Sequence, residues 1–337
     1  MDITLLAIDI AKNVFHCHGV NGKGKQLLRK KLTRKQLLPY MANFPSCTIV
    51  MEACGGANYW YREFIKLGHE VKLINASYVK PYVKTNKNDY NDAEAIAEAA
   101  SRENMRFVSP KTIEQQDIQS IHRIRKNLVE NRTGLSNQIR GLLAEYGVIF
   151  PQGIRYIRNQ ISGVLEDAEN DLTMLTRELI SDLYGQLCIL DEKIKEYDQR
   201  VKLIFKQNEA CQRISCIEGV GVLTATALIA AVGDPNVFKN GRHFAAWLGL
   251  VPKQKSTGGK QVLLGISKRG DSYLRSLLIS GARAAMKFLD RKTESKYDWL
   301  KAVVGRAGRY KAAVALANKN ARVIWALLAS GEAYKAA

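Results

Sequence analysis

The sequence has no hydrophobic run long enough to cross a membrane and no pattern typical of a secreted or zinc-binding protein. The longest apolar stretch, residues 222–232, is far shorter than the roughly 20 residues that span a bilayer. The N-terminus lacks the basic and apolar regions of a signal peptide. The 6 cysteines are scattered without a Cys-x-x-Cys pair, which argues against a zinc site or a disulfide scaffold. We therefore expect a cytoplasmic protein with reduced thiols and no membrane association.

Acidic residues are also scarce. The chain has 51 Lys and Arg against 32 Asp and Glu, a formal net charge of +19, and residues 251–337 alone hold 18 basic and 5 acidic residues. With 46% hydrophobic residues and only 7 prolines, this is a folded chain rather than a disordered basic tail, and 337 residues allow two domains. A protein this basic is expected to bind a polyanion, most commonly nucleic acid, through its C-terminal part.

Strand and helix patterns alternate up to about residue 105, and helical periodicity alone continues from about residue 112. Because hairpins open the chain, we predict a mixed sheet covered by helices, an α/β fold followed by an α region. The predicted strands are residues 3–10, 14–20, 25–32, 47–53 and 71–74, and the helices between them are residues 34–44 and 58–67.

Residues 112–146 and 172–204 carry apolar residues at helical spacing for longer than an ordinary globular helix. We predict an antiparallel coiled-coil arm, either closing on itself or pairing two subunits; two ordinary core helices are the alternative. The second stretch has ten apolar positions in steps of three or four: Leu172, Leu175, Leu179, Leu183, Leu187, Leu190, Ile194, Tyr197, Val201 and Ile204.

Four acidic residues interrupt the apolar pattern or follow it. Asp9 lies inside one apolar strand and Glu52 ends another, and burying an unpaired carboxylate is costly. Asp89 and Asp92 lie three residues apart at the start of a predicted helix, on one face of its first turn. In one interpretation Asp89 caps the helix and Asp92 is a charge favoured by the helix dipole. In the other, both are metal ligands. If all four converge, they supply oxygen ligands for one or two Mg²⁺ ions, as in an RNase H-like nuclease core.

Two segments of the C-terminal half suit phosphate binding. In residues 217–221, Gly219 and Gly221 let backbone N–H groups approach a phosphate, as in a helix-hairpin-helix. Residues 256–259 form a Ser-Thr-Gly-Gly loop flanked by lysines. A serine there becomes a nucleophile only if a base or metal takes its proton, so the acids of the first domain would have to reach it. A solvated loop that touches the DNA backbone is the alternative.

These segments occur in the order seen in one known family. The runs at residues 7–12, 51–53, 88–93, 217–221 and 244–270 together resemble the DEDD insertion-sequence transposases of the one-ten and eleven-eleven families, relatives of the Piv-type DNA invertases. The likeness covers nearly the whole chain. It implies a RuvC-like domain with the RNase H fold (residues 1–108), a helical, coiled-coil region (109–210), and a mainly helical transposase domain (211–337) with the helix-hairpin-helix and the serine loop.

The resemblance also implies an activity. The family's acid tetrad maps onto Asp9, Glu52, Asp89 and Asp92, which bind Mg²⁺, and a C-terminal serine attacks DNA to form a covalent protein–DNA link. Members are guided by a structured bridge or seek RNA that pairs with donor and target DNA. They exchange strands through a Holliday-junction-like intermediate in a homo-oligomer, a dimer or tetramer, with acids from one subunit and serine from another. The setting would be a prokaryotic cell, near the nucleoid.

The resemblance leaves two hydroxyls open as nucleophile. Thr257 holds the position directly before glycine, but we expect Ser256 because a primary hydroxyl is less hindered. His16 and His18 alternate on a predicted strand and are expected to be exposed. Six cations are predicted to contact phosphates: Lys253, Lys255, Lys260, Lys268, Arg269 and Arg275.

The resemblance thus implies an RNA-guided DNA recombinase, and three other functions are alternatives to it. A metal-dependent junction resolvase would cut with water and leave the serine incidental, and a non-catalytic scaffold would use only the basic end. An actin-like kinase or ATPase also opens with an apolar strand ending in aspartate, but its glycine-rich phosphate loops are not found in the sequence.

Overall fold

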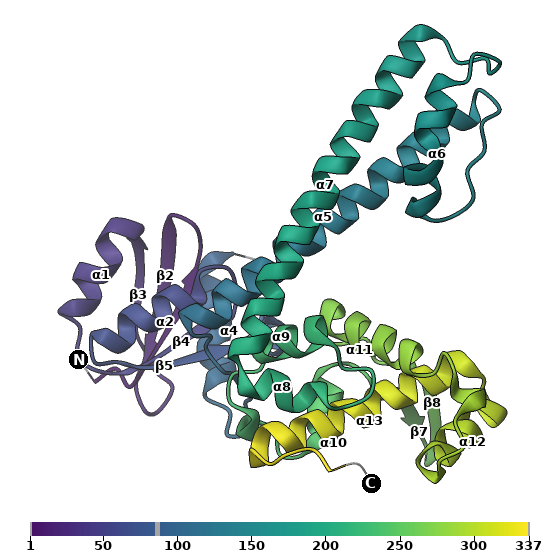
Figure 1. The fold of residues 1–337 in the computed structure, drawn as a ribbon. Helices are drawn as coiled ribbons and strands as arrows, with labels where there is room; N and C mark the ends of the chain where they lie inside the picture. Colours follow the sequence, from purple (N-terminus) through teal and green to yellow (C-terminus); the bar gives the residue numbers. More distant parts are fainter. Residues whose placement is uncertain (1, 85–87, 336–337) are drawn as a thin grey trace. The chain divides into compact units, whose positions relative to one another are not determined.

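The computed structural model describes residues 2–84 and 88–335, and it divides the chain into two compact units, one up to residue 112 and one from residue 113 (Figure 1). Each unit has a hydrophobic core of its own. No helix in the described part of the chain is both long and apolar enough to cross a membrane. The finer division into three parts at residues 108 and 210 stays a prediction.

The first unit contains a six-stranded mixed sheet with the order β3-β2-β1-β4-β5-β6. β1 is antiparallel to β2 and parallel to β4, β5 is parallel to β4, and the two edge strands are antiparallel to their neighbours. The predicted mixed α/β sheet is confirmed and is consistent with an RNase H-like fold. The strands are β1 (Leu5–Ile10), β2 (Val14–Val20), β3 (Gln26–Thr33), β4 (Thr48–Glu52), β5 (Glu70–Ile74) and β6 (Phe107–Val108).

Helices cover both faces of this sheet. Successive residues of a strand point to opposite faces, so Leu6 and Ile8 of β1 join the core under α1 and α2, while Ala7 joins the core under α3 and α4. Burial on both faces explains the continuous apolar run of this strand. The helices are α1 (Arg34–Ala42), α2 (Ala57–Lys66), α3 (Ala76–Val79), the 3-10 turn η1 (Lys80–Tyr82) and α4 (Asp89–Ala100).

The second unit is mainly helical and holds one two-stranded sheet. Its largest core gathers apolar side chains from α8 to α13, among them Phe244, Leu278 and Ile324. Its elements are α5 (Ile113–Ala144), α6 (Ile154–Glu166), α7 (Met174–Gln207), α8 (Glu209–Ser215), α9 (Val222–Ala231), η2 (Pro235–Val237), α10 (Gly241–Trp247), β7 (Pro252–Thr257), β8 (Lys260–Ile266), α11 (Ser272–Ala285), η3 (Leu289–Arg291), η4 (Ser295–Tyr297), α12 (Asp298–Ala307) and α13 (Arg309–Ser330).

The long helices α5 and α7 lie side by side and run antiparallel (Figure 1). Two ion pairs fix their register: Arg125 Nε lies 2.5 Å from Asp198 Oδ1, and Arg132 Nη1 lies 3.1 Å from Asp191 Oδ1. From the first pair to the second, the position advances by seven residues on α5 and goes back by seven on α7, as expected for antiparallel helices.

The buried residues of α7 recur every seven positions, the spacing of a coiled-coil seam: Ile180, Leu187, Ile194 and Val201. The first positions of the predicted apolar stripe do not belong to this seam. Leu175 and Leu179 are 64% and 51% exposed, and Leu172 precedes the helix. Supercoiling of this arm, and pairing of subunits through it, stay predictions.

Candidate active site

Two neighbouring parallel strands each end in an acid. Asp9 is the last residue but one of β1, and Glu52 is the last residue of β4. Ile8 is paired with Met51, so the acids that follow them lie beside each other at the same edge of the sheet. Both side chains are partly buried.

Helix α4 brings two further acids to the first unit's candidate site. Asn88 caps the helix, because its Oδ1 accepts hydrogen bonds from the backbone N–H groups of Tyr90 (3.0 Å) and Asn91 (2.9 Å). The alternative in which Asp89 is the cap is therefore wrong. Asp89 and Asp92 occupy the first helical turn, where the helix dipole favours negative charge.

The carboxylates of the strand end and the helix start converge. Single oxygens of Asp9, Asp89 and Asp92 all lie within 4.8 Å of one another. Burial, followed by the negative charges of Asp92, Asp89 and Glu52, raises the pKa of Asp9 from 3.8 to about 6. The structure thus gathers three of the four predicted acids, and Glu52 is near enough for its charge to act on Asp9.

A buried histidine adjoins these acids. His16 of β2 is the strand partner of Asp9 and is only 4% exposed. Its Nδ1 atom has no hydrogen-bond partner and lies 3.6 Å from Oδ2 of Asp89. The predicted exposure of His16 and His18 is wrong, because β2 lies between β1 and β3 and α4 packs against it. A buried nitrogen that makes no hydrogen bond and faces an acid cluster fits a site that is completed by a cation.

We expect His16→Ala to weaken Mn²⁺ binding by about tenfold, because groups that orient metal ligands typically contribute 10–100-fold to affinity. Titration calorimetry on the metal-free protein measures the change. His18→Ala is the matched control, since His18 is buried two residues along the same strand, and it should leave the affinity unchanged. Equal weakening by both variants would show a general loosening of β2 instead of an effect on Asp89.

In the second unit, the predicted serine loop is a β-hairpin, so the prediction of a loop is wrong. β7 and β8 are antiparallel, and Gly258 and Gly259 form the turn with φ values of 55° and 76°, a conformation that favours glycine. Ser256 pairs with Gln261 across the hairpin, and its Oγ accepts a hydrogen bond of 2.9 Å from Gln254 Nε2.

Most of the predicted phosphate contacts lie on or beside this hairpin, whose residues 252–265 are all exposed. Arg275 differs from the others. It is partly buried, and its Nη1 donates hydrogen bonds to the backbone oxygens of Leu248 (3.2 Å) and Arg269 (3.3 Å). These bonds give Arg275 a structural role that requires no contact with a phosphate. The exposed cations are Lys253, Lys255, Lys260, Lys268 and Arg269.

The turn at Gly219 joins α8 to α9 and is explained by close packing. Gly219 has a φ of +90°, and a Cβ atom on Gly281 of α11 would lie 1.9 Å from its carbonyl oxygen. Gly221 has open space around it. Phosphate binding by these two glycines, and a helix-hairpin-helix in the functional sense, stay predictions.

Gly281→Ala should therefore lower the free energy of unfolding by about 3 kcal/mol, the upper end for overpacking, because backbone faces backbone on both sides. Urea denaturation measures the effect. Gly141→Ala on the exposed face of α5 is the control; nothing surrounds its Cβ position, and alanine there should stabilise the helix by up to about 1 kcal/mol. Unchanged stability of Gly281→Ala would contradict the close packing.

Comparison with known proteins gives consistent matches over both units. Residues 6–148 match a DEDD-type family model described as "Transposase", and residues 211–298 match "Transposase IS116/IS110/IS902 family". The chain is 48% identical to the transposase for insertion sequence element IS1111A of Coxiella burnetii over 334 residues, 99% of this chain and 92% of that protein. It is 44% identical to a probable family 20 transposase of Pseudomonas aeruginosa over 99% of both chains. The pilin gene-inverting protein of Moraxella bovis is 24% identical over 84% of this chain and 83% of its own.

A mixed sheet with acids at its strand ends, in a chain matched to DEDD transposases, defines an enzyme that acts on DNA. The chain belongs to the IS116/IS110/IS902 family of insertion-sequence transposases, and the resemblance inferred from the order of its motifs is confirmed. The first matched segment contains all four predicted acids, and the second contains Ser256.

Proposed function

We propose that this transposase cuts and rejoins donor and target DNA with an Mg²⁺-binding tetrad and a serine nucleophile. The tetrad is Asp9, Glu52, Asp89 and Asp92. The observation that carries the proposal is the convergence of three of these carboxylates, which come from a strand end and a helix about 80 residues further along the chain. Exposed acids often gather without a metal, but Asp9 is partly buried, and the nitrogen of His16 is directed at the same cluster.

The residues of the cluster fit a hard divalent cation. Mg²⁺ prefers carboxylate oxygens and keeps several waters, and Asp89 is exposed, so solvent reaches the cluster. Glu52, which acts on the pKa of Asp9, is the proposed fourth ligand. A bound divalent cation would neutralise charge on the phosphate that is attacked.

The hydroxyl of Ser256 is the proposed attacking group. Its oxygen bonds to phosphorus while the bond from phosphorus to the departing sugar oxygen breaks, and the departing oxygen gains the proton that serine loses. Ser256 is exposed near the tip of a hairpin that also carries Lys253, Lys255 and Lys260, which are suited to hold the DNA phosphates. Thr257 points to the opposite face of the strand, so one DNA strand meets only one of the two hydroxyls.

A structured guide RNA and a dimer or tetramer complete the proposal. Residues 251–337 hold 18 basic against 5 acidic residues, which offers a surface for a second polyanion besides DNA. Leu175 and Leu179 at the start of α7 are exposed, which supports contact between subunits through the arm.

A metal-dependent, resolvase-like nuclease is the second candidate. The acids belong to the first unit and Ser256 to the second, so the first unit holds the groups that metal-dependent hydrolysis by water requires. In that case, DNA would be nicked without becoming attached to protein.

The two functions are separated by incubating the purified protein with labelled DNA ends of its insertion sequence and Mg²⁺, together with any RNA that co-purifies. We expect label to remain attached to protein after denaturation. Nicked DNA without attached protein would favour the nuclease, and uncut DNA would favour a non-catalytic scaffold. Sequencing of the co-purified RNA tests guidance: one structured transcript from the element supports it, and random fragments contradict it.

A further inference from the structure

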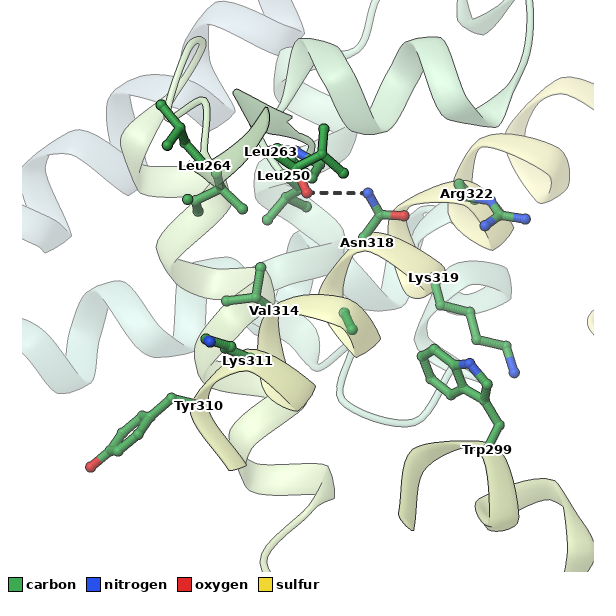
Figure 2. A pocket seen from close by; sticks show the side chains of 14 residues that line it. Leu250, Leu263, Leu264, Trp299, Tyr310, Lys311, Val314, Asn318, Lys319 and Arg322 are labelled. Carbon is green, nitrogen blue, oxygen red and sulfur yellow. Dashed lines mark hydrogen bonds between the residues drawn. The ribbon is translucent and has the colours of Figure 1, made fainter. Parts of the chain in front are cut away.

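A groove of about 1030 Å³ in the second unit contains none of the residues proposed for catalysis. The hairpin β7–β8, α12 and α13 form its walls. Figure 2 shows Leu263 and Leu264 on the hairpin side, Val314 on α13 and Trp299 on α12. Ligand sites commonly measure about 300–1,000 Å³, so this groove has room for several ring-sized groups.

The charges around the groove have one sign. Its charged lining residues are Lys311, Lys319 and Arg322, and none of the 14 lining residues is acidic. Leu263 and Leu264 of the wall are 65% and 51% exposed, which is unusual for adjacent leucines that only pack a core. The groove therefore combines an apolar lining with positive charge.

Two aromatic side chains in the groove have a cation over one face of the ring. Trp299 is 41% exposed, and Nζ of Lys319 lies 5.1 Å from its ring centroid, an arrangement visible in Figure 2. Tyr310 is 80% exposed, and the guanidinium of Arg283 lies 5.8 Å from its ring centroid. An exposed ring with a cation over one face can stack a base on its other face, and the cation supplies a charge for the adjoining phosphate.

A second, smaller cavity that shares Tyr310 with the groove is also lined by apolar and basic side chains. Tyr310 also lines a smaller cavity of about 270 Å³ that contains Arg283, Lys287 and Met286. Tyr310 thus stands between two hollows that are both lined by apolar and basic side chains, which suits an extended chain of nucleotides better than one small molecule.

We propose that this groove binds unpaired DNA, with bases stacked on Trp299 and Tyr310 and phosphates held by Lys311, Lys319 and Arg322. Duplex DNA keeps its base faces stacked inside and presents phosphates and groove edges, so it would leave the exposed rings and leucines unused. A protein partner would have to supply acids against three cations, whereas every DNA strand carries the matching charge. The inference rests on the action of this family on DNA and is independent of the serine and guide RNA.

The test is fluorescence anisotropy of the full chain with labelled DNA of about 16 nucleotides, near the upper end of single-strand site sizes. The same sequence as a duplex and as RNA completes the set, all at one salt concentration. Trp299→Ala and Tyr310→Ala should each weaken single-strand binding by about tenfold and change duplex binding by less than about twofold. Trp299→Phe, which keeps a stacking face, should retain most of the affinity.

Tyr310 is 80% exposed, so its replacement should leave the fold intact, and circular dichroism checks this. Tyr78→Ala, at an exposed tyrosine of the first unit, is the matched control and should bind like the unsubstituted protein. Unchanged single-strand binding in both groove variants would overturn the proposal. So would equal losses for duplex and single strand, tighter binding of RNA than of DNA, or a loss of self-association in sedimentation without any loss of DNA binding. Because no DNA is cut in this assay, its result does not depend on the proposed catalytic function.

Discussion

Asp9→Asn is expected to abolish Mg²⁺-dependent DNA cleavage while making the metal-free protein more stable. Asp9 lies at the centre of the charge cluster, since the carboxylates of Asp92, Asp89 and Glu52 all raise its pKa. An amide binds Mg²⁺ far less well than a carboxylate. Charge stabilisation by a metal is worth several kcal/mol, so cleavage should fall by about a thousandfold or more.

The gain in stability follows from the direction of the pKa shift. Folding raises the pKa of Asp9 from 3.8 to about 6, so the ionised form is disfavoured in the folded state. The metal-free protein should lose stability as the pH rises from about 4 to about 6 and stay at the lower value above that range. Asparagine carries no charge, so Asp9→Asn should lack this step and melt a few degrees higher at neutral pH.

Thermal melts with and without Mg²⁺ measure both effects. Mg²⁺ should raise the melting temperature of the unsubstituted protein, because it binds the folded state, and should leave Asp9→Asn unchanged. Asp171→Asn, at an exposed acid of the second unit, is the control and should behave like the parent. A lower melting temperature for Asp9→Asn at neutral pH, or full stabilisation of that variant by Mg²⁺, would contradict a shared cation site.

Ser256→Ala should abolish the covalent link between protein and DNA and leave DNA binding within about twofold of the parent, since the hydroxyl contributes little to holding phosphates. Adjacent residues of β7 point to opposite faces. Thr257→Val, which removes the neighbouring hydroxyl at similar volume, should therefore keep the adduct. Denaturing gels of the reaction with labelled DNA measure both variants.

The reverse pattern would assign the attack to Thr257. An adduct that survives both substitutions would exclude the hairpin hydroxyls. Nicking that persists in Ser256→Ala without any adduct would indicate that water is the attacking group. Gln254→Ala is a useful companion, because Gln254 donates the hydrogen bond to the serine oxygen, and its loss should slow the reaction without abolishing it.

Two of the acids, Asp9 and Glu52, were predictable because they interrupt or end an apolar strand. Asp9 and Glu52 stand at the ends of strands that are otherwise buried, and parallel strands bring such ends together. His16 was missed because alternating polar residues on a strand indicate an exposed face. Here the polar face of β2 lies under α4, beside the acids, and that contact joins segments more than 70 residues apart.

The hairpin was missed for a related reason. Lys, Ser, Thr and Gly dominate residues 253–260 and are typical of loops, and every residue of this segment is exposed, so no hydrophobic periodicity marks β7. The helical arm was easier to predict, because its buried seam repeats every seven residues. Its start was overestimated, because Leu175 and Leu179 fit helical spacing but lie outside the seam.

The β7–β8 ribbon has two open edges, and a lone pair of strands is only marginally stable in water. Efficient chemistry requires a nucleophile held within about half an ångström, and two strands alone provide little support for the proposed Ser256 hydroxyl. Docking of a polymer along an open edge would stiffen the ribbon and bring the hydroxyl into line. Under the proposed serine mechanism, attack on DNA would then start only after DNA had docked along this edge.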